Sequence, residues 1–89
     1  MKAKLTWAPA AWDEYIYWQS QDKKTLKRIN RLIQDIMHEP TSLVGLGEPE
    51  LLKYDLSGCI SRRIDAANRL VYVAHGDSVL IISCRGHYD

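Results

Sequence analysis

The sequence is short of several features that mark other classes of protein. It contains no phenylalanine and only two cysteines among 89 residues, and its 12 lysines and arginines nearly balance 11 aspartates and glutamates. Its apolar runs, such as VLII at residues 79–82, are short, whereas a membrane span needs about 18 residues. The first residues lead into an alternating pattern rather than the apolar core of a signal peptide. We therefore expect a soluble, cytoplasmic protein with no membrane contact.

The scarcity of cysteine and the short length restrict the function further. Cys59 and Cys84 form no C-x-x-C motif, and the histidines and cysteines do not stand at metal-ligand spacing. Reduced, buried thiols are expected, with no metal and no cofactor. A chain of this length has room for one small core, which excludes two-domain enzymes, so residues 1–89 are predicted to form a single domain. The net charge of +1 is also unlike that of typical nucleic-acid-binding domains.

The charges are nevertheless segregated along the chain. The first predicted helix carries Asp13 and Glu14, whereas the second carries cations at helical spacing and no acid between Lys23 and Ile33. These cations are Lys24, Lys27, Arg28 and Arg31, which we call the basic stripe. Such a stripe is either a solvated helix face or a surface for phosphates, and the sequence leaves both interpretations open.

The apolar pattern of the first half predicts one strand and two helices. Strict alternation over residues 2–7 is typical of a strand, and helical spacing predicts a helix over residues 9–20. Asp22 is a suitable N-cap for a second helix, which ends before Pro40. The stripe that this helix is expected to bury consists of Leu26, Ile29, Ile33, Ile36 and Met37.

The second half predicts strands alone. Four apolar segments follow one another at residues 51–56, 59–65, 69–74 and 78–85, and the turns between them are short enough to require antiparallel hairpins. The expected fold is α+β in the order β-α-α-β-β-β-β, with two N-terminal helices packed on one face of an antiparallel-rich sheet. The first strand is expected at or next to an edge.

Polar residues that interrupt the strand pattern are candidates for chemistry. RNA cleavage without a metal needs a base for the 2′-OH, cations for the charge at phosphorus, and an acid for the departing 5′ oxygen. Glu50, Arg63 with Arg69, and His87 suit these three roles. Arg63 and Arg69 share a sheet face only if the loop between their strands has an odd number of residues. Composition alone equally allows a solvated Glu50, a frayed His87 and exposed arginines.

Six collinear stretches resemble the YoeB/Txe toxins of bacterial toxin–antitoxin modules, a branch of the RelE superfamily of messenger-RNA interferases. The stretches are WDEYIYWQ (12–19), GEPELLK (47–53), LSG (56–58), SRRI (61–64), RLVY (69–72) and CRGHY (84–88). Together they extend the resemblance from Lys4 to Tyr88. In the turn before Arg69, Ala66, Ala67 and Asn68 depart from the family pattern.

The resemblance implies a RelE-like, microbial-RNase-like fold and a ribosome-dependent endoribonuclease. Such an enzyme cleaves messenger RNA in the ribosomal A site without metal, through a 2′,3′-cyclic phosphate, and so inhibits translation. By position, Glu50 is the implied general base, His87 the general acid and Arg69 the main transition-state cation. Lys53, Arg62 and Arg63 are implied as substrate contacts, and Tyr88 as a residue that orients the RNA base or the site.

The resemblance also implies partners. A cognate antitoxin of the YefM/Phd type, the 70S ribosome and messenger RNA are expected, with operator DNA bound only by the toxin–antitoxin complex and a homodimer as a further expected state. The alternative is a non-catalytic RNA- or ribosome-binding module with a decayed site. A third interpretation is an interaction protein without an RNA partner, whose binding would be insensitive to salt.

Overall fold

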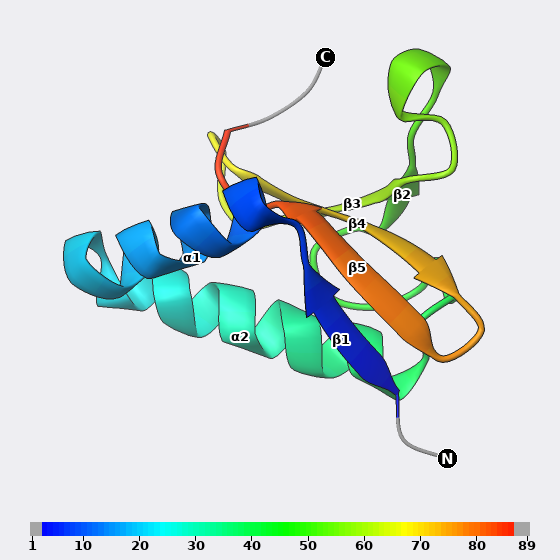
Figure 1. Cartoon of the computed structure of the whole chain (residues 1–89), viewed down its shortest axis with the longest axis horizontal. Helices are drawn as coiled ribbons and strands as arrows, with labels where there is room; N and C mark the ends of the chain where they lie inside the picture. The colour runs from blue at the N-terminus through cyan, green and yellow to red at the C-terminus, as the bar shows by residue number, and fades with distance from the viewer. Residues whose placement is uncertain (1–2, 87–89) are drawn as a thin grey trace.

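The computed structural model describes residues 3–86 and contains one five-stranded sheet with two helices (Figure 1). The elements follow in the order β1 (Lys4–Trp7), α1 (Pro9–Gln21), α2 (Lys23–His38), β2 (Glu50–Leu51), the 3-10 helix η1 (Tyr54–Leu56), β3 (Ile60–Arg63), β4 (Arg69–His75) and β5 (Ser78–Ser83). Across the sheet the strands lie in the order β1-β5-β4-β3-β2. The predicted α+β class is confirmed, and β1 lies at an edge.

The sheet is mixed but mainly antiparallel. β2 pairs with β3, β3 with β4, and β4 with β5 as antiparallel neighbours, in agreement with the predicted hairpins. Only β1 runs parallel to its neighbour β5, with Lys4 opposite Ser78 and Trp7 opposite Ile81. The three interior strands, β5, β4 and β3, therefore come from the C-terminal half of the chain.

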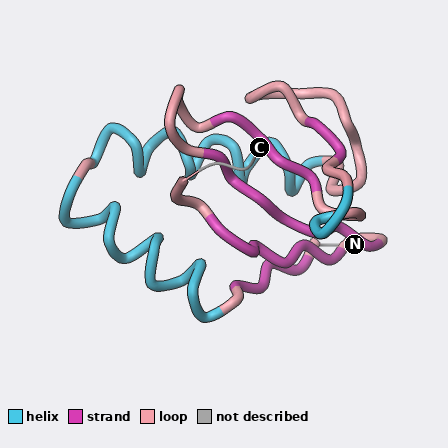
Figure 2. Tube along the Cα trace, turned by 90° about the horizontal axis from the view of Figure 1, so that it is seen from above, coloured by secondary structure: helices cyan, strands magenta, loops and turns pink. Residues whose placement is uncertain are grey.

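One aspartate ends the first helix and begins the second. Asp22 has an extended backbone, and its N–H donates to the Trp18 carbonyl at 3.0 Å, which closes α1. Its carboxylate accepts hydrogen bonds from the N–H groups of Lys24 and Thr25, so it is also the N-cap of α2, as predicted. The result is the tight corner between the two helices that is visible in Figures 1 and 2.

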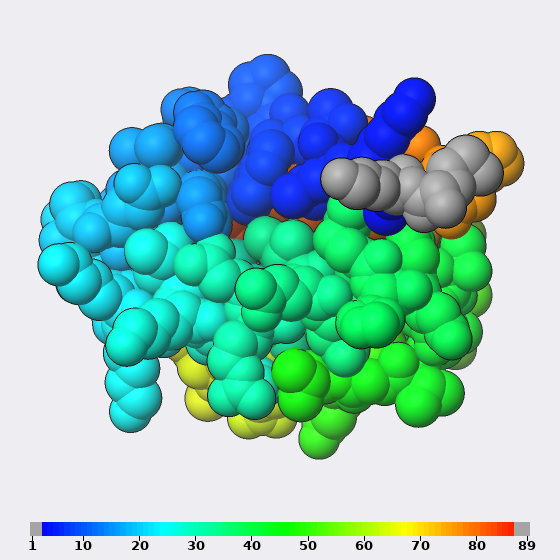
Figure 3. Space-filling view, turned by 90° about the horizontal axis from the view of Figure 1, so that it is seen from below, coloured from blue at the N-terminus to red at the C-terminus, as the bar shows by residue number. Residues whose placement is uncertain are grey.

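The core lies between the helices and one face of the sheet. Ile29, Leu32 and Ile36 of α2 are fully buried against Leu70 and Tyr72 of β4. Leu26, Ile33 and Met37, which belong to the predicted stripe, are only partly buried, and Leu32 lies in the core although the prediction did not include it. Figure 3 shows α2 and the loop after it as one continuous side of the molecule, coloured cyan to green.

The predicted strand over residues 51–56 is wrong. β2 has only two residues, and η1 replaces the rest of the expected strand. Tyr54 has a positive φ of 59° and is 92% exposed, so the chain turns away from the sheet there. Leu51 is 52% exposed as well, because no helix covers this end of the sheet. Apolar residues at this position therefore do not indicate a buried strand.

Arg62 lies inside the protein rather than on its surface, which corrects the expectation that it contacts substrate. Only 1% of it is exposed, and its guanidinium forms an ion pair with Asp35 of α2. It also donates to the Tyr72 hydroxyl and to the Leu46 carbonyl, each at 3.0 Å. The Asp35 carboxylate in turn accepts the Leu46 N–H at 3.1 Å. These contacts, which we call the buried network, tie α2, the loop before β2, β3 and β4 together.

The buried network gives Asp35 a clear effect on stability. Hydrogen bonds from Arg62 and then from the Leu46 N–H hold the pKa of Asp35 below its ordinary value. A carboxyl group with a lowered folded-state pKa contributes stability that is complete above its unfolded-state pKa and is lost as the pH falls through the folded value. Removal of Asp35 also leaves the charge of Arg62 buried and unpaired, which is costly.

We predict that Asp35→Ala lowers the free energy of unfolding by about 3 kcal/mol at neutral pH. The variant should also lose less stability than the wild type as the pH falls below about 4. Urea unfolding followed by circular dichroism at several pH values measures both effects. The control is Asp13→Ala, which removes an exposed helical carboxylate and should change stability by less than about 0.5 kcal/mol. Equal costs for the two variants would contradict the prediction.

Candidate active site

The candidate site lies on the sheet face that carries no helix, which we call the helix-free face. Glu50 of β2 is opposite Ser61 of β3, Ser61 is opposite Val71 of β4, and Val71 is opposite Ser83 of β5. These four residues form one row across the sheet. Their strand neighbours Ile60 and Leu70 belong to the core, so the row faces away from the helices.

Two arginines stand side by side on the helix-free face. Arg63 and Arg69 are directly opposite each other at the β3–β4 hairpin and lie two residues from Ser61 and Val71, so they share the face of the row. Like charges placed opposite each other repel in the absence of an anion. The hairpin therefore presents a pair of cations suited to a phosphate, as the sequence analysis allowed.

The two arginines are held differently. The Arg69 guanidinium donates to the carbonyls of Asp65 at 2.7 Å and Asn68 at 3.2 Å, so it is folded onto the hairpin turn. The Arg63 side chain is exposed, while its backbone carbonyl accepts a hydrogen bond from Arg28 of α2 at 3.1 Å. Arg69 is thus the better ordered of the two cations, and Arg63 is free to move toward a ligand.

Glu50 lies close to this cation pair. Because it is opposite Ser61, its Cα is roughly 7 Å from that of Arg63 along the diagonal between strands. Its side chain is exposed. The loop that leads to Glu50 is fixed by a 2.6 Å hydrogen bond from the Arg63 N–H to the Gly47 carbonyl. Gly47 has a φ of 78°, and a Cβ there would lie 2.8 Å from Leu32 and 3.0 Å from the Arg63 backbone, so only glycine fits.

Lys53 lies just beyond the end of β2. It follows β2 and precedes η1, where its exposed side chain forms no hydrogen bond or ion pair with any residue of the described part, 3–86. The Leu52 N–H donates to the Cys59 carbonyl at 2.8 Å, which keeps this segment beside β3. Lys53 is therefore an exposed cation beside β2, without a partner among residues 3–86.

His87 and Tyr88 lie outside the described residues, but the segment before them is well anchored. The Cys84 N–H donates to the Glu14 carboxylate at 2.8 Å, and the Cys84 carbonyl accepts the Trp18 indole N–H at 2.9 Å. The Arg85 guanidinium lies 3.7 Å from the centre of the Tyr17 ring. Helix α1 therefore holds the end of β5 through three of its side chains.

The β3–β4 turn holds the last described residue. The Gly86 N–H donates to the Asn68 side-chain oxygen at 2.7 Å, and the Gly86 carbonyl accepts the Arg69 N–H at 2.7 Å. The residue just before His87 is thus bonded to the backbone of Arg69. The sequence does not show that Asn68 and Glu14 bind the C-terminal segment. Turn residues and helical acids are common, and nothing local indicates a partner in a distant strand.

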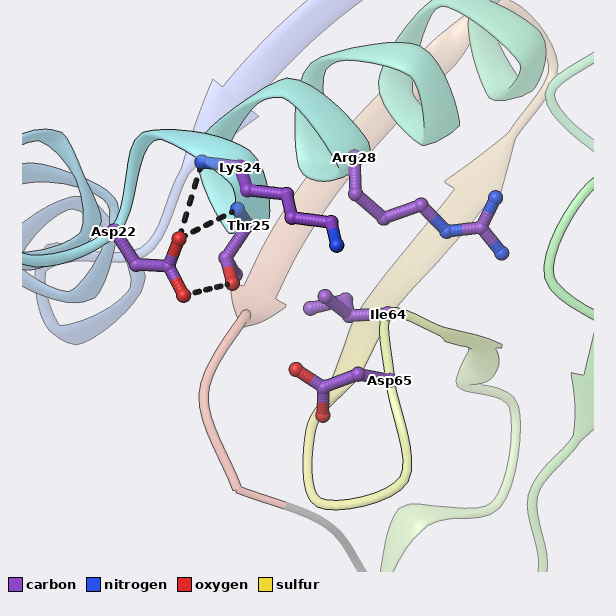
Figure 4. Close-up of a pocket in the computed structure, with 6 residues that line it drawn as sticks. All are labelled: Asp22, Lys24, Thr25, Arg28, Ile64 and Asp65. Atoms are coloured by element: carbon purple, nitrogen blue, oxygen red, sulfur yellow. Dashed lines mark hydrogen bonds between the residues drawn. The ribbon is translucent and has the colours of Figure 1, made fainter.

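Part of the basic stripe lies beside the site. Lys24 and Arg28 line a cavity of about 370 Å³ between the start of α2 and the hairpin residues Ile64 and Asp65, as Figure 4 shows. Arg28 is half-buried and supports the Arg63 backbone, whereas Lys24, Lys27 and Arg31 are exposed. The stripe therefore has one structural member and three that remain available to an anionic partner.

Within residues 3–86, no three histidine, cysteine or acidic side chains form a group that could hold a metal ion. In the same part of the chain, neither helix has the length and apolarity needed to cross a membrane.

Comparison with known proteins gives consistent matches over the whole chain. Residues 7–88 match the model of a family described as the YoeB-like toxin of bacterial type II toxin–antitoxin systems. Toxin YoeB of Escherichia coli strain K12 is 51% identical over 85 residues, which cover 96% of this chain and 99% of that protein.

Solved structures are also similar over almost the whole chain. The YoeB dimer from Staphylococcus aureus is 41% identical with a TM-score of 0.89, and it aligns over 99% of this chain and 100% of its own. A heterotetrameric YoeB–YefM toxin–antitoxin complex from the same organism aligns with a TM-score of 0.87, 41% identity and the same coverage. The fold observed in this chain is therefore shared with toxins solved both alone and with an antitoxin.

The anchored end of β5 predicts a difference between the two thiols. Burial, and secondarily the charge of Glu14, raises the pKa of the Cys84 thiol to about 12, so only about one molecule in ten thousand is a thiolate at pH 8. Cys59 is partly exposed. At pH 8 we expect a disulfide reagent such as Ellman's to label one thiol quickly and the second only after urea is added. Cys59→Ser should abolish the fast phase, and fast labelling of that variant would contradict the assignment.

Proposed function

This chain belongs to the family of YoeB-like toxins of bacterial type II toxin–antitoxin systems, and we propose that it cleaves messenger RNA in the ribosomal A site. The observation that carries the proposal is the order of groups across the helix-free face. The cation pair Arg63 and Arg69 lies in the middle, Glu50 on the β2 side, and Gly86, which precedes His87, on the β5 side. In-line attack at phosphorus needs its base and acid on opposite sides.

In the proposed reaction, the Glu50 carboxylate takes the proton of the 2′-OH, and the 2′ oxygen forms a bond to phosphorus. The bond to the 5′ oxygen breaks, and His87 supplies the proton that this oxygen acquires. The products are a 2′,3′-cyclic phosphate and a 5′-OH end. Arg69 and Arg63 stabilise the charge that grows on the phosphoryl oxygens, and Lys53 contacts a neighbouring phosphate. Tyr88 is proposed to orient the RNA base. None of these steps uses a metal ion.

The exposure of the site supports dependence on the ribosome. Ser61, Val71 and Ser83 of the row are buried, but the proposed side chains of Glu50, Lys53 and Arg63 are all exposed, so these groups meet RNA at the surface rather than in a closed pocket. Orientation of the 2′-OH, phosphorus and leaving oxygen is worth several orders of magnitude in rate, and an open surface supplies little of it. We propose that the ribosome holds the messenger in a reactive conformation and that free RNA is cleaved slowly.

We further propose a YefM-type antitoxin as the partner of this chain, since the similar toxin from S. aureus is solved in complex with YefM. A homodimer is proposed on the same basis, because that toxin is also solved as a dimer. Binding of operator DNA is proposed for the toxin–antitoxin complex alone. All of these partners place the proposed activity in the cytoplasm.

The acid and the base can be tested with matched controls. Glu50→Gln and His87→Gln should each lower cleavage of messenger RNA on purified ribosomes by about 10²- to 10⁴-fold. Glu48→Gln and His75→Gln alter exposed residues outside the proposed machinery and should leave the rate unchanged. Ribosome binding without cleavage by the wild type would favour the alternative of a non-catalytic ribosome-binding module. Full activity of either site variant would contradict its assigned role.

The cations should differ in importance. Arg69→Gln should lower kcat by about 10²- to 10³-fold, because an ordered guanidinium beside the reacting phosphate is lost. Lys53→Gln should lower kcat less, since the ammonium of Lys53 has no hydrogen-bond or ion-pair partner among residues 3–86 to hold it in place. Lys4→Gln, at the opposite edge of the sheet, serves as the control for a change in net charge. Single-turnover cleavage on ribosomes gives the three rates, and equal losses for Arg69 and Lys4 would refute the ranking.

A further inference from the structure

The side chain of Asn68 links the β3–β4 turn to the C-terminal segment. Its oxygen accepts the Gly86 N–H at 2.7 Å. Its amide nitrogen donates to both carboxylate oxygens of Asp65, at 3.0 and 3.2 Å. A backbone N–H can only donate and a carboxylate can only accept, so the orientation of the amide is fixed by its two neighbours.

Asp65 is itself held by the turn. One of its carboxylate oxygens accepts the N–H groups of Ala67 and Asn68, each at 2.8 Å. The carboxylate therefore cannot rotate away without the loss of several hydrogen bonds, and it fixes the plane of the Asn68 amide. The chain of contacts runs from the Asp65 backbone through two side chains to the backbone of Gly86.

Gly86 adds a second constraint at the same point. Its φ of 83° lies in the left-handed region, which residues other than glycine rarely adopt. A Cβ at this position would meet no atom within 4 Å, so the requirement for glycine comes from the backbone and not from space. With both its N–H and its carbonyl bonded, Gly86 is held in one orientation beside Arg69.

We propose that Asn68 is a positioning residue that acts through Gly86 on His87 and Tyr88. It orders the segment before the proposed general acid relative to Arg69, and it touches no substrate itself. This inference rests on the proposed function and deepens it, because it names the contact that brings the acid and the main cation into one unit. The role needs an acceptor toward Gly86 and a donor toward Asp65, which alanine lacks altogether.

Asn68→Ala should lower kcat for ribosome-dependent cleavage by about 10- to 100-fold, the effect expected when a reacting group is misplaced by about 1 Å. KM should not change, because Asn68 makes no contact with substrate. Asn30→Ala is the matched control: Asn30 accepts the Tyr15 hydroxyl at 2.6 Å between α1 and α2, whereas Gly86 bonds Asn68 and Arg69. Its kcat should equal that of the wild type. An equal fall in kcat for both variants would indicate only a loss of stability and would overturn the proposal.

A charge-conserving exchange separates positioning from mere bulk. Asn68→Asp alone places a second carboxylate beside Asp65 and should be at least as slow as Asn68→Ala. In the double variant Asp65→Asn with Asn68→Asp, the new amide donates to the new carboxylate, whose other oxygen accepts the Gly86 N–H. We expect this exchange to restore most of kcat. A double variant as slow as the single one would count against the proposed hydrogen-bond chain.

The backbone offers an independent variant. Gly86→Ala should reduce kcat, whereas Gly76→Ala, in the β4–β5 turn, should not. Gly76 also has a positive φ, of 59°, and also has open space around a Cβ, so the two substitutions strain the backbone in a similar way. If both variants cleave equally well, Gly86 has no special role and the proposal fails.

Hydrogen exchange provides a readout that does not depend on activity. The Gly86 amide should exchange slowly in the wild type and in Asn30→Ala, and much faster in Asn68→Ala, as measured by NMR. Rapid exchange in the wild type would overturn the proposal. Absence of cleavage by the wild type on ribosomes would overturn the proposed function itself, whereas normal cleavage by Asn68→Ala beside an active wild type would overturn the positioning role alone.

Discussion

The ion pair between Arg62 and Asp35 joins parts of the chain that are far apart in sequence and fixes the strand that carries half of the site. Arg62 forms an ion pair with Asp35 of α2 and donates hydrogen bonds to the Tyr72 hydroxyl of β4 and the Leu46 carbonyl. The Asp35 carboxylate accepts a hydrogen bond from the Leu46 N–H. The loop after α2 is thereby held against β3, one residue before Gly47 bonds the Arg63 N–H. Because a buried charge tolerates few alternative partners, this pair favours one register of the loop over others.

Arg62 and Arg63 are adjacent in β3 but lie on opposite faces of the sheet, because successive side chains of a strand point to opposite faces. Arg62 points into the core and supports the fold, whereas Arg63, the next residue, points to the helix-free face and pairs with Arg69. Any slip of β3 by one residue would exchange the two roles and bury the site cation. The buried network therefore protects the proposed function indirectly, since it makes the slipped register lose an ion pair and several hydrogen bonds.

Local features of the fold could be predicted, and features that depend on distant partners could not. The role of Asp22 follows from neighbours within three residues, and the hairpins follow from short turns. The burial of Arg62 depends on Asp35, 27 residues earlier, and no local pattern distinguishes it from Arg63. The length of β2 depends on the positive φ of Tyr54, which propensity does not indicate for an aromatic residue. For the site, the pairing of Arg63 with Arg69 required the number of turn residues, which only the structure supplied.

Glu50 and Arg63 are fixed at their backbones, whereas their side chains form no contact that orders them within residues 3–86. Backbone hydrogen bonds join Gly47 to Arg63 and Gly86 to Arg69, so the Cα positions on both sides of the cation pair are set by short, direct contacts. The side chains of Glu50 and Arg63 extend from these positions into solvent. To order an arginine side chain costs up to about 2 kcal/mol, and in a chain this small no surrounding pocket offsets that cost in advance. In the proposed reaction, contacts with a phosphate that the ribosome holds in place offset this cost, so exposed side chains on a well-anchored sheet are sufficient.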